Sequence, residues 1–142
     1  MLVLATLAGG YWFLLRGDGG PSGAFPQAEQ RITAAARAVT ESATAVQRYL
    51  ELESFAVAID QQLVVIRAET EKLRKVEQDS DGDAAVIAGD AVDAATRIAT
   101  SSVSFRDAIA GSGDLADADA ARLDIEASIT KLEQQLRAWK KL

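Results

Sequence analysis

The C-terminal segment DLADADAARLDIEASITKLEQQLRAWKKL (residues 114–142) contains neither Gly nor Pro and indicates the fold class. Acidic Asp114 and Asp117 open the segment and Arg137, Lys140 and Lys141 close it, so each charge sign lies at the helix end that the dipole favours. Its apolar residues recur every three or four positions, the spacing of one helix face: Ala118, Ala121, Ile125, Ile129, Leu132, Leu136 and Trp139. This pattern predicts an amphipathic helix that packs against other helices.

The segment before it has the same pattern, and turn sequences bound it on both sides. DSDGD (79–83) and GSGD (111–114) are rich in turn-forming residues, and Asp83 is a candidate N-cap. We therefore predict a helix over about 83–110. Its apolar stripe, like that of the last helix, has the heptad spacing of a coiled coil and comprises Ile87, Ala91, Ala94, Ile98, Ser102, Phe105 and Ile109.

Residues 26–78 contain no Gly and a single Pro, Pro26, at the start, so they predict one long helix. In an antiparallel arrangement the three stripes meet, with Phe55 level with Phe105 and Ala121. The prediction is an all-α chain in which residues 52–142 form a three-helix bundle. Residues 26–51 then extend beyond the bundle as a helical stalk.

The stalk carries an apolar stripe with nothing to cover it in this arrangement. We predict that this stripe binds a protein partner or a second copy of the chain, through Ile32, Ala36, Val39, Ala43, Val46 and Leu50. The alternative is a bend near Glu51–Ser54, which would fold residues 26–50 back as the fourth helix of a four-helix bundle.

Residues 2–15, LVLATLAGGYWFLL, carry no charge and lie before a linker, residues 17–25, rich in Gly, Ser and Pro. We predict that residues 1–16 are a membrane anchor, with a cleaved signal segment or a buried soluble helix as alternatives. Fourteen helical residues cover only about 21 Å, so a spanning helix requires a thinned bilayer or further residues upstream. We expect an extracytoplasmic body; the cytoplasmic orientation stays open.

Composition excludes most catalytic chemistry. The chain has no Cys and no His, and its net charge of −6 argues against a nucleic-acid partner. Glu77, Asp79 and Asp81 with Gly82 follow the first half of a calcium-binding EF-hand loop, but Ala88 stands where a bidentate Glu is required. We therefore expect a polar turn there, with no metal, cofactor or catalytic residues.

The resulting hypothesis is a non-enzymatic, membrane-anchored helical protein of an envelope complex, which uses the stalk for self-association or partner binding. The alternative is an extracytoplasmic four-helix bundle that senses a ligand, although a small-molecule ligand is not favoured by this sequence.

Overall fold

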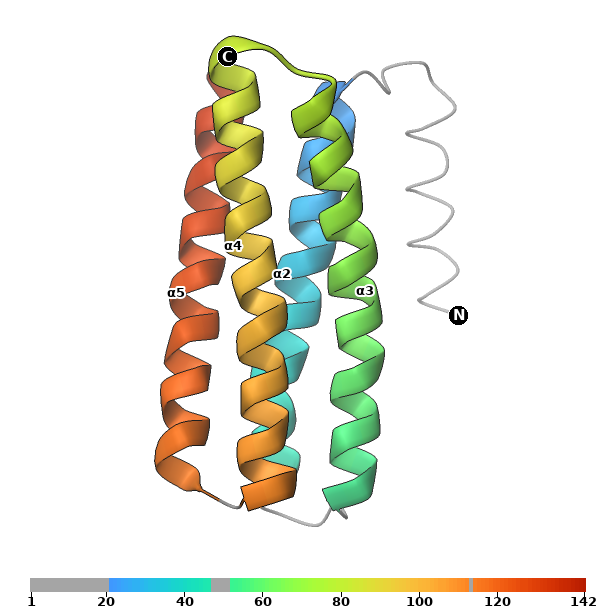
Figure 1. Cartoon of the computed structure of the whole chain (residues 1–142), viewed down its shortest axis with the longest axis vertical. Helices are drawn as coiled ribbons and strands as arrows, with labels where there is room; N and C mark the ends of the chain where they lie inside the picture. Colours follow the sequence, from blue (N-terminus) through green and yellow to red (C-terminus); the bar gives the residue numbers. More distant parts are fainter. Residues whose placement is uncertain (1–20, 47–51, 113) are drawn as a thin grey trace.

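The structure is a computed structural model that describes residues 21–46, 52–112 and 114–142. Four helices form the described part of the chain (Figure 1): α2 (Pro21–Val46), α3 (Leu52–Gln78), α4 (Gly82–Asp107) and α5 (Leu115–Lys140). A short π-helical turn, η1 (Ala108–Ser112), continues α4. The described ranges contain no β-strand, which confirms the predicted all-α class.

The helices run up and down in chain order as a four-helix bundle (Figure 1). Each helix packs against the next one along the chain, and α5 closes the ring by packing against α2. Diagonal contacts are few by comparison, as in a bundle with a central core.

The prediction of one continuous helix over 26–78 is wrong. The chain reverses direction between Val46 and Leu52, so α2 lies against α3 and α5 instead of extending beyond them. The physical reason is the apolar stripe of α2, which loses contact with water when it packs into the bundle. The four-helix alternative is therefore the one that the structure supports.

The N-terminal end of α2 also differs from the prediction. The helix begins at Pro21, so Pro26 lies inside it and the last five residues of the predicted linker are helical. Phe25 is fully buried, and its ring stacks on that of Trp139 of α5, with centroids 4.7 Å apart and planes inclined by 7°. This aromatic pair fixes the start of α2 against the end of α5.

The predicted seams of α4 and α5 are confirmed as core. All their members are buried or partly buried. Phe55 and Phe105 meet as predicted, with ring centroids 6.0 Å apart.

The turns differ from the prediction in one detail. Asp81, not Asp83, is the residue before α4, and Asp83 lies in the first turn of that helix. Gly82 adopts a φ of 58°, which only Gly reaches without strain. Asp114 caps α5 as its sequence position suggests, because its Oδ1 accepts hydrogen bonds from the backbone N–H groups of Ala116 (3.0 Å) and Asp117 (3.2 Å).

Candidate functional site

The described members of the predicted partner-binding stripe of residues 26–50 face the core of the bundle. Ile32, Ala36 and Val39 are fully buried among the other helices. Ala43 and Val46 belong to α2, but their side chains lie outside the described part of the structure, as does the whole of Leu50. The three described members contribute to internal packing and present no surface to a partner, which corrects the premise that the stripe is uncovered.

Two buried carboxylates lie between α2 and its neighbours. Glu29 accepts a hydrogen bond from the Thr33 hydroxyl (3.0 Å), and its residue is only 4% exposed. Glu69 of α3 is held by Arg31 at 3.1 Å and Lys72 at 2.9 Å, both on Oε1. The Arg31–Glu69 contact joins α2 to α3, whereas the hydrogen bond of Glu29 stays within α2. Sequence periodicity did not identify these two carboxylates because polar residues at the edges of a seam resemble surface residues.

Burial raises the pKa of Glu29 above its ordinary value of 4.5, and the nearby carboxylate of Glu133 adds to this effect. The Thr33 hydroxyl, Lys140 and Arg37 oppose it by favouring the charged form. The environment of the α2–α5 interface therefore disfavours the charged form of Glu29.

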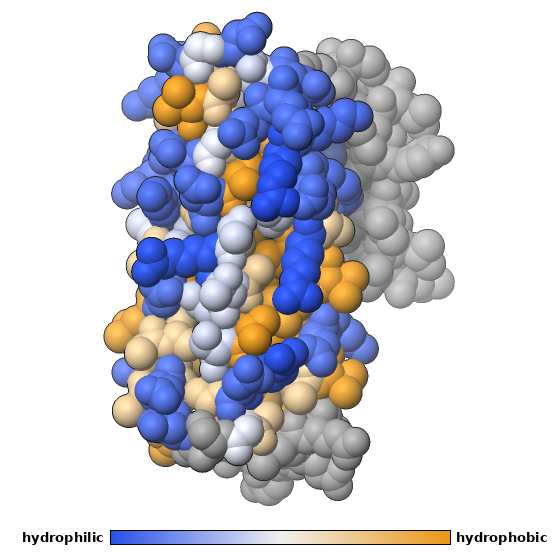
Figure 2. Space-filling view, in the orientation of Figure 1, coloured by the Kyte–Doolittle hydropathy of each residue, from blue (hydrophilic) through white to orange (hydrophobic). Residues whose placement is uncertain are grey.

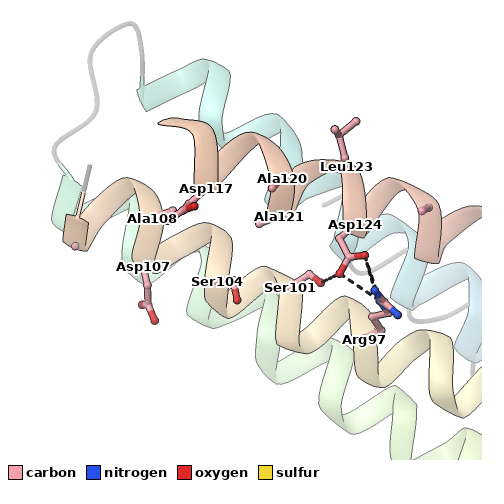
Figure 3. Close-up of a pocket in the computed structure, with 12 residues that line it drawn as sticks. Arg97, Ser101, Ser104, Asp107, Ala108, Asp117, Ala120, Ala121, Leu123 and Asp124 are labelled. Carbon is pink, nitrogen blue, oxygen red and sulfur yellow. Dashed lines mark hydrogen bonds and ion pairs between the residues drawn. The ribbon is translucent and has the colours of Figure 1, made fainter. Parts of the chain in front are cut away.

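An open groove runs between the C-terminal half of α4 and the N-terminal half of α5 (Figure 3). Its walls combine small side chains with polar ones: Arg97, Ser101, Ser104, Asp107, Ala108 and Gly111 from α4 and η1, and Asp117, Ala120, Ala121, Leu123, Asp124 and Ala127 from α5. Sequence reasoning marks the hydroxyls of α4, including Ser101 and Ser104, as a candidate polar lining, but it does not show which residues of α5 lie opposite them.

Arg97, Ser101 and Asp124 form the polar end of the groove (Figure 3). Asp124 accepts from the Arg97 guanidinium (Nη2–Oδ1 3.0 Å) and from the Ser101 hydroxyl (Oγ–Oδ2 2.7 Å). These two hydrogen bonds lower the pKa of Asp124, and the Arg97–Asp124 contact raises the pKa of Arg97. The cluster is a polar link between α4 and α5 in which Arg97 and Asp124 reach solvent and Ser101 is buried.

The hydroxyls of α4 other than Ser101 bond to their own helix. Thr96, Thr100, Ser102 and Ser104 each donate to the backbone carbonyl four residues earlier. The Ser101 hydroxyl instead donates to the carboxylate of Asp124 on α5.

Three valines lie exposed on the outer side of α3. Val57 and Val64 are 51% and 68% exposed, and Val65 beside them is 38% exposed. Figure 2 shows orange, apolar atoms among blue, hydrophilic ones along the α3 side of the bundle. Sequence analysis assigned no role to this face, although valines outside the core stripe of α3 can be recognised in the sequence.

The described residues include no group of three or more acidic side chains placed to hold a metal ion. Around the acidic turn after α3, the Asp79 N–H donates to the Lys75 carbonyl (2.9 Å) and the Ser80 hydroxyl donates to the Val76 carbonyl (2.6 Å). These bonds are those of a helix end and a turn.

In the part of the chain that the structure describes, no helix combines the length and apolar character needed to cross a bilayer. The predicted anchor, residues 2–15, lies outside the described residues.

Comparison with family models, with curated proteins and with solved structures finds no match to this chain.

Proposed function

We propose that this chain is a non-enzymatic interaction protein: a four-helix bundle that binds another protein through the outer face of α3. The observation that supports this proposal is the exposure of Val57, Val64 and Val65 on a helix whose core face is already packed. Valine is up to about 0.7 kcal/mol less favourable than Ala in a helix, so water-exposed valines stabilise neither the helix nor the core. Contact with a partner gives them a physical role.

We further propose that residues 2–15 hold this bundle at a membrane, with the body on the extracytoplasmic side. The support is the uncharged sequence itself, together with the linker that starts at Gly17. The full chain is expected to sediment with membranes and to resist alkaline extraction, whereas a chain lacking residues 2–15 is expected in the soluble fraction. Equal distribution of the two chains would contradict membrane attachment.

A photo-cross-linking amino acid at Val64 in the full chain, expressed in its own cells, tests the interaction proposal. Val86 on α4 is the matched control, because it is a valine of similar exposure, 64% against 68%. We expect a discrete adduct from position 64 and none from position 86. Absence of an adduct at position 64, or equal adducts at both positions, would contradict the proposal.

A second candidate function is ligand sensing through the α4–α5 groove. The supporting observation is the groove itself, which is lined by Asp107, Asp117 and Asp124; Arg97 pairs with Asp124 and Arg106 pairs with Asp107. Such a lining suits a small organic cation. Spermidine or a related amine is then expected to raise the melting temperature increasingly with its concentration, and to do so less in Asp117→Asn. An unchanged melting temperature would contradict this candidate.

A further inference from the structure

We propose that the bundle opens along the α2–α5 interface and that ionisation of the buried Glu29 side chain promotes this opening. The inference concerns the interior of the bundle and is independent of the exposed valines of α3. Three features support it: the connections between the helices, the contacts that hold α2 against α5, and the surroundings of Glu29.

The α2–α5 interface is the one side of the described bundle that no loop crosses. The helices α2 and α3, α3 and α4, and α4 and α5 are each consecutive in the chain, whereas α2 and α5 are not. The helix α2 also packs less extensively against α5 than against α3. Separation of α2 from α5 therefore leaves every connection between helices intact and breaks the smallest of the four interfaces around the ring.

Two specific contacts hold this interface closed. Near one end of the bundle, the ring of Phe25 stacks on that of Trp139. Further along α2, Arg37 pairs with Glu133 at 2.9 Å, but the side chains of the pair are 60% and 35% exposed. An ion pair so open to water contributes little to stability. Apolar packing is therefore the main stabilising contribution here.

Glu29 lies along α2 between these two contacts and is only 4% exposed. Its carboxylate accepts a hydrogen bond from the Thr33 hydroxyl of the same helix, so this bond does not tie α2 to α5. Arg37 contributes a positive potential, but it pairs with Glu133 instead. A buried carboxylate without a paired cation is costly in its charged form. The interface thus contains a group that favours closure only when it is protonated.

Charged groups act on Glu29 from α2 and from α5. Burial has the largest effect and raises its pKa, and the Glu133 carboxylate of α5 adds to this effect. The Thr33 hydroxyl, Lys140 of α5 and Arg37 of α2 act in the opposite direction. The net result is a pKa above the ordinary value of 4.5 in the closed bundle.

The other two helices supply no free charge to this site. The buried residues of α4 include no charged side chain. On α3, the buried Glu69 is already held by Arg31 and Lys72. Titration of Glu29 is therefore set within the α2–α5 interface.

The sign of the pH dependence follows from these surroundings. Opening exposes Glu29 to water, where the ordinary pKa of 4.5 applies, whereas the closed form has the higher pKa. Between these two values opening releases a proton, so the open fraction rises with pH, by at most about tenfold per pH unit. At lower and at higher pH the open fraction is constant. The chain has no His, so no imidazole titrates in the same range.

Opening makes part of the core accessible. The helix α2 contributes Ile32, Ala36 and Val39 to that core, and all three are fully buried in the closed form. Separation from α5 admits water or an apolar partner to this side of α2. The proposed device therefore makes the accessibility of the α2 stripe depend on pH.

Hydrogen–deuterium exchange of the full chain in detergent micelles, followed by mass spectrometry at several pH values from about 4.5 to 8, tests the proposal. Division by the intrinsic exchange rate at each pH gives protection factors that report opening alone. The reference helix is α4, which lies diagonally opposite α2. The test variant is Glu29→Gln, and the matched control is Glu41→Gln, which changes an exposed carboxylate of the same helix.

Local opening and global unfolding both expose Glu29 and release the same proton, so pH alone does not distinguish them. The level of protection and its response to urea do. We expect protection in α2 to be at least about tenfold below that in α4 and to change little in dilute urea, whereas protection in α4 falls steeply with urea. Equal protection and equal urea response in the two helices would show global unfolding only and would overturn the proposal.

The pH series tests the role of Glu29. In the wild type and in Glu41→Gln, protection of α2 is expected to fall as pH rises above 4.5 and then to level off. In Glu29→Gln it is expected to keep its low-pH value throughout. Protection of α2 that is independent of pH in the wild type, or a fall that persists in Glu29→Gln, would overturn the proposal.

Discussion

Glu29 shows how a single buried carboxyl group makes the stability of this fold depend on pH. It lies in the α2–α5 interface with one hydrogen bond, from Thr33, and with Glu133 nearby. Because burial raises its pKa, the folded state binds a proton more tightly than the unfolded state. The stabilisation from protonated Glu29 is therefore complete below the ordinary value of 4.5 and is lost as pH rises through the higher pKa of the folded state.

We predict that Glu29→Gln removes this loss. The neutral amide has nearly the same shape, so the variant should match the wild type at low pH and exceed its free energy of unfolding near neutral pH. Urea unfolding at a series of pH values measures the difference.

Thr33→Val provides the companion variant. It removes the hydrogen bond that favours the charged form of Glu29, so stability near neutral pH should fall further than in the wild type. If the free energy of unfolding changed with pH in the same way for the wild type and for Glu29→Gln, the result would contradict this account of the interface.

At the scale of the element, α2 is the helix that distinguishes this structure from the sequence prediction. The seams of α4 and α5 were predictable because an amphipathic stripe reports which face is buried regardless of what covers it. The reversal before Leu52 was only the alternative prediction, since no Gly or Pro marks residues 47–51. Packing of the α2 stripe, a tertiary effect, determines the direction of the chain there.

The same limitation explains why residue spacing alone did not reveal the candidate sites. The Arg97–Asp124 contact and the α4–α5 groove depend on which helices are neighbours, and residue spacing within one helix does not contain that information. The exposed valines of α3 were present in the sequence, but they are recognisable as an outer face only once the core face of α3 is known.

We predict that Phe25→Ala lowers the free energy of unfolding by about 3–5 kcal/mol, as for other buried aromatic residues. The substitution removes the ring that stacks on Trp139 and leaves a cavity at one end of the bundle. Leu115→Ala, at an exposed apolar position, is the control and should change stability by less than about 0.5 kcal/mol. Equal effects of the two substitutions in urea unfolding would show that Phe25 is not part of the core.

At the scale of the whole molecule, the four helices enclose one core, to which α2 contributes Ile32, Ala36 and Val39. The α2 helix contacts both α3 and α5, so it closes the ring of helices.

The central claim is that α2 folds back as the fourth helix, and a distance between α2 and α5 tests it most directly. Arg37 and Glu133 form an ion pair at 2.9 Å, and the Arg31–Glu69 contact places position 37 level with position 63 of α3. In a continuous helix, position 37 would lie 26 residues before position 63 along the same axis, or about 39 Å away from it.

Spin labels on cysteines introduced at positions 37 and 133 of the full chain, measured by pulsed electron paramagnetic resonance, distinguish the two arrangements. The bundle predicts a single short distance, below about 20 Å, since packed helices are about 8–10 Å apart. A distance near 40 Å would contradict the account and restore residues 26–51 as a stalk.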